Sequence, residues 1–257
     1  MKKAYFISDL HVGSHDQENE ILKEKYLRSF FDFLNQEHEF SLYIVGDLFD
    51  FWFEYKHAIP TYYQHILSKL MLLRERGIPI TFISGNHDFW MRDFFEKHMG
   101  IPTFHGIHTE TILGKSFFFF HGDGIVEKDA GYRTLKRILQ NPLVIRLYRW
   151  IHPDIGIPIA RYASQLSRNH YALEPEEAAA EDAEYIAYAE KQFQKGYDIV
   201  VMGHTHRPMV HKKKDKIYIN LGDWLVHFTY ATFDGQTLEQ HTWKLNEEKP
   251  PEESFVF

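Results

Sequence analysis

Residues 42–52 constrain the possible fold of this chain more than any other stretch. They read LYIVGDLFDFW, an apolar run rich in β-forming residues that ends at Gly46 and is followed at once by Asp47. An apolar run that ends in Gly-Asp is typical of a buried strand leading into a loop. The carboxylate is then expected at the carboxyl end of that strand, where open α/β sheets bind ligands. Taken alone, Asp47 could equally be a turn residue that caps a helix.

The same layout of apolar strand, turn and polar side chain recurs at four other places. The strands are predicted at residues 3–7, 80–83, 117–120 and 199–202, and the polar residues that follow them are Asp9, His11, Asn86, His87, Asp88, His121, Asp123, His204 and His206. Because the carboxyl ends of parallel strands meet at one edge of a sheet, these side chains are candidates for one site.

The remaining elements predict a mixed α/β chain. Apolar residues at helical spacing predict helices over 21–34 and 62–76, and a short helix is expected near 91–98. The order βαβαβ in the first part implies parallel strands with right-handed crossovers. Residues 103–120 predict a hairpin that enters a second sheet, and further strands are expected at 216–221, 225–233 and 238–245.

Composition limits the chemistry and the class of protein. The 257 residues are 44% hydrophobic, enough for one large domain, and they include no cysteine. Any metal must therefore be held by His, Asp, Glu or Asn. A net charge of −7 argues against bulk nucleic-acid binding. No apolar run is long enough to span a membrane, and Asp9 and His11 interrupt the first strand too soon for a signal peptide, so a cytoplasmic protein is expected.

Residues 128–170 differ from the rest of the chain because they are basic and apolar. They contain eight Lys or Arg and two acidic residues, and three prolines divide them into short helices. This pattern predicts a lid that binds an anionic and greasy molecule or lies on an anionic membrane surface. A helical subdomain with its own core is the alternative. Residues 174–190, acidic and rich in alanine, predict a helix that docks back on the core.

The candidate ligands suit a pair of divalent ions. They are oxygen and nitrogen donors, which favour Mn²⁺, Fe or Zn²⁺ over Mg²⁺, and they number too many for one ion but enough for two that share a carboxylate: Asp9, His11, Asp47, Asn86, His121, His204 and His206. Two ions about 3.5–4 Å apart can clamp the attacking and leaving oxygens in a phosphoryl displacement.

Together, the blocks DLH, GD, GNHD, HGD and GHTH resemble those of the calcineurin-like metallophosphoesterase superfamily. The five blocks occur in the same order as in that superfamily and extend over residues 9–206. The resemblance implies an αββα sandwich of two mixed sheets and a dinuclear metal-activated hydroxide. It also implies that Asp9, His11 and His206 hold one ion, that Asn86, His121 and His204 hold the other, and that Asp47 bridges them. His87 would be the general acid or a phosphate-stabilising residue, with Asp88 orienting it, and His87 and Asn86 are the expected catalytic residues.

Within that superfamily the chain looks most like the UDP-2,3-diacylglucosamine hydrolases, a family of pyrophosphatases in lipid A synthesis. The resemblance rests on GDLFDFW, on HGD followed by Asp129-x-x-Tyr132-Arg133, on GHTHRP at 203–208 and on LGDW at 221–224. That family releases UMP and 2,3-diacylglucosamine 1-phosphate, and a helical lid follows its His-Gly-Asp block. By position, Asp129, Tyr132, Ser167 and Arg168 are expected to bind substrate. The family commonly has Arg after the Asn of its third block, where this chain has His87.

The expected protein is thus a metal-dependent hydrolase of one domain, residues 1–245, with an inserted helical lid over 124–195 and a flexible tail over 246–257. Two divalent ions, with Mn²⁺ preferred and Fe or Zn²⁺ as alternatives, are the expected cofactors. The expected partners are a UDP-linked acylated glucosamine and the cytoplasmic face of the inner membrane, with neither nucleic acid nor an obligate protein partner. Another calcineurin-like phosphodiesterase or nucleotide phosphohydrolase is the first alternative, and a non-catalytic scaffold is the second.

Overall fold

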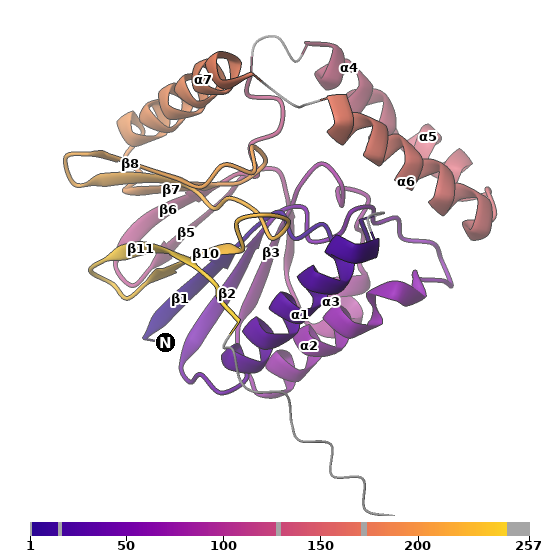
Figure 1. Ribbon diagram of the computed structural model, residues 1–257, viewed down its shortest axis with the longest axis horizontal. Coiled ribbons are helices and arrows are strands. Elements are labelled where there is room, and N and C mark those ends of the chain that lie inside the picture. Colours follow the sequence, from indigo (N-terminus) through magenta and orange to yellow (C-terminus); the bar gives the residue numbers. More distant parts are fainter. Residues whose placement is uncertain (1, 15–16, 127–129, 171–173, 246–257) are drawn as a thin grey trace, which may run out of the picture.

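Two mixed β-sheets pack face to face at the centre of the computed structural model, which describes residues 2–14, 17–126, 130–170 and 174–245 (Figure 1). The first sheet has the order β11-β10-β1-β2-β3-β4, formed by Leu238–Thr242, Thr229–Phe233, Lys3–Ile7, Phe40–Val45, Ile80–Ser84 and Thr103–His105. The second has the order β5-β6-β7-β9-β8, formed by His108–Ile112, Lys115–Phe119, Ile199–Met202, Lys216–Asn220 and Met209–Lys213.

Helices cover both outer faces of this pair of sheets (Figure 1). On the first sheet lie α1 (Gln17–Leu34), α2 (Gln64–Glu75, preceded by a 3₁₀ turn at Thr61–Tyr63) and α3 (Phe94–Met99), which share one hydrophobic cluster with β1, β2 and β3. On the second sheet lies α7 (Pro175–Gln194), which shares a cluster with β6, β7 and β9. The αββα sandwich of two mixed sheets expected from the sequence is confirmed.

Alternation along the strands produces the layers. In β1, Ala4 and Phe6 face the second sheet, whereas Tyr5 and Ile7 face the helices of the first. In β6, Phe117 and Phe119 fill the space between the sheets, and Phe118 points toward α7. Successive side chains of a strand point to opposite faces, so a strand that is apolar throughout must be buried on both. Each fully buried large apolar side chain contributes about 1.5–3 kcal/mol to this packing.

Three sequence predictions differ from the structure. Residues 103–105 form β4, which pairs in parallel with β3, so only β5 and β6 form the predicted hairpin. Residues 225–228 precede β10 and are not part of a strand, because 224–227 form a turn in which the Asp223 carboxylate accepts hydrogen bonds from the backbone N–H groups of residues 225, 226 and 227. Strand β8 was not predicted, because its lysine-rich sequence at the exposed edge of the second sheet lacks an apolar run.

The predicted insert of residues 124–195 divides into two structural parts. Helix α7 belongs to the sandwich. The other three helices lie beyond it and are here called the lid: α4 (Ala130–Leu139), α5 (Pro142–Tyr148) and α6 (Pro153–His170) (Figure 1). Prolines at the first positions of α5 and α6 favour helix starts there, whereas Pro158, which was also expected to divide helices, lies inside α6. None of the helices in the described ranges is both long enough and apolar enough to cross a membrane.

The lid contacts the core through an aromatic cluster. Phe51, Phe53 and Tyr55 follow β2 and pack with Trp90 and with lid residues, among them Tyr148. The Trp90 indole N–H donates a hydrogen bond of 3.0 Å to the carbonyl of Leu139 at the end of α4. The aromatic side chains that follow β2 therefore form the surface on which the lid packs.

Candidate metal centre

The candidate ligands gather at one edge of the sandwich because their strands all end there. Asp9 and His11 follow β1, Asp47 follows β2, Asn86 follows β3, His121 follows β6, and His204 and His206 follow β7. Strands β1, β2 and β3 run parallel in the first sheet, and β6 and β7 run parallel in the second. Their carboxyl ends therefore deliver side chains from both sheets to one place.

The backbone at these strand ends turns sharply. Five candidate ligands have positive φ angles: Asp9 (53°), His11 (43°), Asp47 (50°), His204 (72°) and His206 (58°). This left-handed region is unfavourable for residues with a Cβ atom, and such strain often gathers at functional sites. Gly46 and Gly85 allow the close approach, because a Cβ on Gly46 would lie 2.2 Å from His121 Nδ1 and one on Gly85 would lie 2.2 Å from Asp47 Oδ1.

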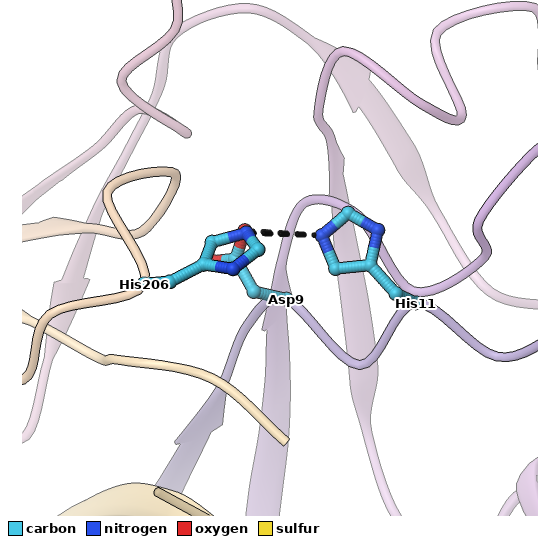
Figure 2. Close-up of side chains that lie close together, drawn as sticks. All are labelled: Asp9, His11 and His206. Carbon is cyan, nitrogen blue, oxygen red and sulfur yellow. Dashed lines mark hydrogen bonds and ion pairs between the residues drawn. The ribbon is translucent and has the colours of Figure 1, made fainter. Parts of the chain in front are cut away.

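Asp9, His11 and His206 form the first group of donors (Figure 2). The Nε2 atoms of His11 and His206 lie 3.1 Å apart. They lie 3.7 and 3.2 Å, respectively, from Asp9 Oδ1. Asp9 and His11 are completely buried, whereas His206 is partly exposed. Three donor atoms this close, from the ends of one strand in each sheet, have the spacing of ligands around one ion.

Asp47, His121 and His204 form a second group, and Asn86 adjoins it. His121 Nε2 lies 3.1 Å from both Asn86 Oδ1 and Asp47 Oδ2. The other ring nitrogen of His121 lies 2.9 Å from the carbonyl oxygen of Val45, which fixes the ring so that Nε2 faces the group. Asp47 Oδ2 is also 3.7 Å from His11 Nε2, so this carboxylate lies between the two groups.

Burial and charge make this cluster strongly dependent on cations. Burial opposes ionisation of Asp47, but His121 and His87 beside it hold the pKa of that carboxyl well below its usual range. Burial also lowers the pKa of His121, yet Asp47 and Asp9 raise it to about 10. Burial lowers the pKa of His87 and of His204 to about 4. Two buried carboxylates ringed by imidazoles require positive charge between them.

The arrangement of donors fits divalent cations. Asp9 Oδ1 is fully buried and accepts no hydrogen bond from any residue in the described part of the chain, although three imidazole nitrogens lie within 3.9 Å of it. A buried carboxylate oxygen that accepts no hydrogen bond and lies among imidazole nitrogens is suited to bind a metal ion. The donor set of carboxylate, amide and imidazole suits Mn²⁺, Fe or Zn²⁺.

His87 lies beside both groups. Its ring packs edge-on against His11 with centroids 4.7 Å apart, and its Nε2 is 3.9 Å from Asp47 Oδ2. Its Nδ1 lies 2.8 Å from the carbonyl oxygen of Asp50. Asp88 does not hold the ring as expected from the sequence, because its two carboxylate oxygens accept hydrogen bonds from the backbone N–H groups of Gly85 and Leu48.

Several residues that support the ligand loops were not predicted from the sequence. The Ser8 hydroxyl lies 2.5 Å from Asp9 Oδ2 and 2.7 Å from the carbonyl of Val45. Asn220 donates from its amide to the carbonyl of Gly203, which precedes His204. Asp50 was part of the quoted GDLFDFW stretch but received no role. No sequence pattern distinguishes these three residues from other polar residues. They are recognised by their place among the ligand loops in the structure.

The structure does not describe the side chains of the substrate-binding residues predicted in the lid. Asp129 lies outside the described residues, as do the tail over 246–257 and the side chains of Tyr132, Ser167 and Arg168. The roles expected for these residues stay predictions. The described part of the lid reaches the ligand loops. Arg161 of α6 donates to the carbonyl of Gly13, two residues after His11, and stacks over Tyr62 at 4.6 Å.

Comparison with known proteins identifies relatives along most of the chain. A family model described as calcineurin-like phosphoesterase matches residues 2–208. The UDP-2,3-diacylglucosamine hydrolase of Porphyromonas gingivalis is 31% identical over 252 residues, covering 92% of this chain and 95% of its own. The enzyme of the same name from Yersinia pseudotuberculosis is 28% identical over 244 residues, covering 93% and 98%. A solved archaeal phosphodiesterase is 15% identical, covers 93% and 99%, and has a TM-score of 0.47.

Proposed function

The chain belongs to the calcineurin-like phosphoesterase family of metal-dependent hydrolases, and from that premise we propose that it hydrolyses the pyrophosphate bond of UDP-2,3-diacylglucosamine. The products would be UMP and 2,3-diacylglucosamine 1-phosphate, known as lipid X. One observation carries the proposal: two joined groups of metal-type donors lie beside a lid that is both basic and apolar. The likeness to two hydrolases of this name over nearly the whole chain supports it.

The proposed metal centre uses the two groups of donors. Asp9, His11 and His206 would hold one ion, Asn86, His121 and His204 would hold the other, and Asp47 would bridge them. Mn²⁺ is the proposed ion, with Fe or Zn²⁺ as the alternatives. When bound, the ions would supply activation of a water molecule and charge neutralisation on the phosphoryl oxygens.

The chain's own residues would orient the substrate and handle protons. His87 is held by the Asp50 carbonyl through Nδ1, which leaves Nε2 facing the cluster. The anionic pyrophosphate, placed beside this ring, would raise the pKa of His87, so that Nε2 could carry a proton to a phosphoryl oxygen or the leaving group. The oxygen of water would attack the phosphorus on the UMP side, and the bond from that phosphorus to the bridging oxygen would break, so that 2,3-diacylglucosamine 1-phosphate leaves with the bridging oxygen.

The lid would bind the rest of the substrate. Its basic residues match the pyrophosphate, and its apolar residues match the two acyl chains. Asp129, Tyr132, Ser167 and Arg168 are proposed to contact the substrate there. A purely polar nucleotide has no acyl chains to pack against the apolar side chains of the lid. This favours the lipid substrate over a simple phosphodiester or nucleotide.

The outer surface of the lid is proposed to contact the cytoplasmic face of the inner membrane. Leu143 and Leu147 are each 69% exposed and Trp150 is 83% exposed, and Arg146 and Arg149 lie between them in the sequence. Exposed apolar side chains with interleaved arginines are typical of segments that lie on anionic bilayers. The proposed location is therefore cytoplasmic and peripheral to the membrane, where a diacylated substrate is accessible.

Identification of the products tests this function. The purified protein is incubated with Mn²⁺ and UDP-2,3-diacylglucosamine, and UMP and the lipid monophosphate are sought by mass spectrometry. Release of both, lost in His87→Ala, is the expected result. No turnover of the lipid, together with hydrolysis of a simple aryl phosphodiester, would contradict the substrate and favour another phosphodiesterase of the family. No hydrolysis of either would favour a scaffold.

A further inference from the structure

We propose that Asp50 is a positioning residue that fixes the ring orientation of two site histidines, His11 through its carboxylate and His87 through its carbonyl. The inference rests on the proposed two-metal centre and adds to it a residue that is neither a ligand nor in contact with substrate. Asp50 lies three residues after Asp47 in the same loop and is completely buried.

The ring of His11 has one nitrogen in the cluster and one outside it. Nε2 faces the first group, 3.1 Å from His206 Nε2 and 3.7 Å from Asp9 Oδ1 (Figure 2). Nδ1 is buried and makes no hydrogen bond within the described part of the chain. The carboxylate oxygen Asp50 Oδ1 lies 3.6 Å from it, and the two side chains are 1% and 0% exposed.

The chemistry of imidazole assigns the proton. A ring nitrogen that binds a metal offers its lone pair, so a neutral histidine bound through Nε2 carries its only N–H on Nδ1. In this chain the Asp50 carboxylate, which can only accept while it is ionised, lies beside that nitrogen. The distance of 3.6 Å exceeds a normal N–H···O bond, and closing it to about 2.9 Å needs a shift of less than about 1 Å.

The backbone carbonyl of Asp50 likewise fixes the ring orientation of His87. Its carbonyl oxygen lies 2.8 Å from His87 Nδ1. A carbonyl can only accept, so Nδ1 carries the proton and the lone pair of Nε2 faces the cluster. Asp50 is itself fixed, because its N–H donates to the carbonyl of Val12 at 3.0 Å. The carbonyl of His87 accepts a hydrogen bond of 3.1 Å from the N–H of Trp52.

This arrangement gives Asp50 influence over both sides of the centre. Metal-bound histidines are usually held through their second nitrogen, and loss of that partner typically lowers metal affinity by about 10–100-fold. The alternative role for Asp50 is to bind a third ion. This alternative arises because donor atoms of His11, Asp50 and His87 lie within 4.8 Å of one another. The hydrogen bond from His87 Nδ1 to the Asp50 carbonyl already occupies that ring nitrogen of His87 and favours positioning.

The test compares Asp50→Leu and Asp50→Asn with a matched control, Glu54→Gln. Glu54 is also a buried carboxylate in this loop, but it accepts hydrogen bonds from the backbone N–H groups that precede and begin α3. Mn²⁺ affinity and stoichiometry are measured by calorimetry on the full chain, without substrate. The expected result is a loss of about 10–100-fold for Asp50→Leu and a smaller loss for Asp50→Asn, whose amide oxygen still accepts. Glu54→Gln should bind as the parent protein does.

A spectroscopic measurement separates positioning from general damage to the fold. In ¹⁵N-labelled protein loaded with Zn²⁺, His11 should show a ring N–H signal at Nδ1 that exchanges slowly with water. That signal should shift in Asp50→Asn and disappear in Asp50→Leu. Asp50→Asn keeps the shape of the side chain, so it serves as the test if the leucine variant does not fold.

Two results would overturn the inference. One is an Asp50→Leu or Asp50→Asn variant that binds Mn²⁺ as tightly as the parent and keeps the His11 ring signal unchanged. The other is a stoichiometry of three ions that falls to two when Asp50 is replaced, which would make Asp50 a ligand. Failure of the lipid substrate in the product assay would change neither measurement, so the two proposals fail separately.

Discussion

Lys136 on lid helix α4 forms an ion pair with Asp123, whose buried carboxylate lies two residues after His121. Arg133, one turn earlier on α4, donates to the carbonyl of Val126 in the same loop at 2.6 Å. At the other end of the lid, Arg161 donates to the carbonyl of Gly13, two residues after His11. The lid is thus anchored at both ends to loops that carry candidate ligands, and these contacts hold it beside the site.

Replacing Lys136 by Met should release the first of these anchors. The Asp123 carboxylate would stay buried without this ion pair, at a cost of about 2 kcal/mol, which corresponds to a fall of about 4–8 °C in unfolding temperature. Hydrogen exchange over residues 130–139 should become faster. KM for the lipid substrate should rise, while kcat for an aryl phosphodiester should change little. Arg137→Met, at the exposed neighbouring position, is the control, and equal effects of the two substitutions would contradict the anchor.

The same pair has a predictable pH dependence. Burial raises the pKa of Asp123, but Lys136 and His121 more than offset this and hold it below its usual range. A carboxyl whose folded pKa is depressed contributes stability above its unfolded pKa, and that contribution is lost as the pH falls through the folded pKa. The difference in unfolding temperature between the parent and Lys136→Met should be constant from pH 5 to 8, about 1–4 units above the unfolded pKa, and shrink below about pH 4. A difference that grows on acidification would refute this assignment.

Asp47→Asn should remove metal and activity together. The carboxylate lies between the two groups of donors, 3.1 Å from His121 Nε2 and 3.7 Å from His11 Nε2. An amide has neither the charge nor two equivalent oxygens with which to bridge two cations. Bound metal, measured by atomic emission, should fall below one ion per chain, and turnover should fall by at least about 10³-fold, equivalent to about 4 kcal/mol. Asp32→Asn, a half-exposed site on α1, is the control. Retention of both ions and full turnover would overturn the bridging role.

Gly203→Ala should damage the site without changing a ligand. A Cβ atom there would lie 2.0 Å from Ser8 Oγ and 2.4 Å from Asp9 Oδ2, so Asp9 would have to move. Mn²⁺ affinity should fall at least about 10-fold, a loss of about 1.4 kcal/mol. Gly131→Ala on α4 is the matched control, because a Cβ there meets nothing within 4 Å. Unchanged Mn²⁺ affinity in Gly203→Ala would show that the loop relaxes around the methyl group.

The outer surface of the lid should bind anionic bilayers. Trp150 and Leu147 are exposed and flank Arg149. Trp150→Ser combined with Leu147→Ser should reduce sedimentation with phosphatidylglycerol vesicles by at least about 10-fold, because each buried apolar side chain contributes about 1.5 kcal/mol or more. Hydrolysis of an aryl phosphodiester should persist. Val226→Ser, at an exposed apolar position outside the lid, is the control, and equal sedimentation of all variants would exclude the lid as the contact.

The ligand set could be predicted because its pattern is local. At each of five places an apolar strand ends and a ligand-type side chain follows, and the geometry of parallel strands then requires these ends to meet. The lid could be recognised as a separate piece from its charge and its prolines, but its bounds could not. Helix α7 was placed within the bounds of the insert, 124–195. The sequence also predicted that this helix docks back on the core, and Tyr185 and Phe193 pack against the second sheet as expected.

The layers, the edge at which the site lies and the chemical type of its ligands could be inferred from the sequence, because alternation and strand ends are properties of neighbouring residues. Which donors face one another, and which side chains hold them, depends on how distant segments pack. Asp50 and His11 are far apart in the chain, and a distance of 3.6 Å between them arises only when β1 and β2 pair in parallel register. The ion pair of Lys136 with Asp123 likewise depends on how α4 docks, since packing between distant segments is not encoded in any local pattern.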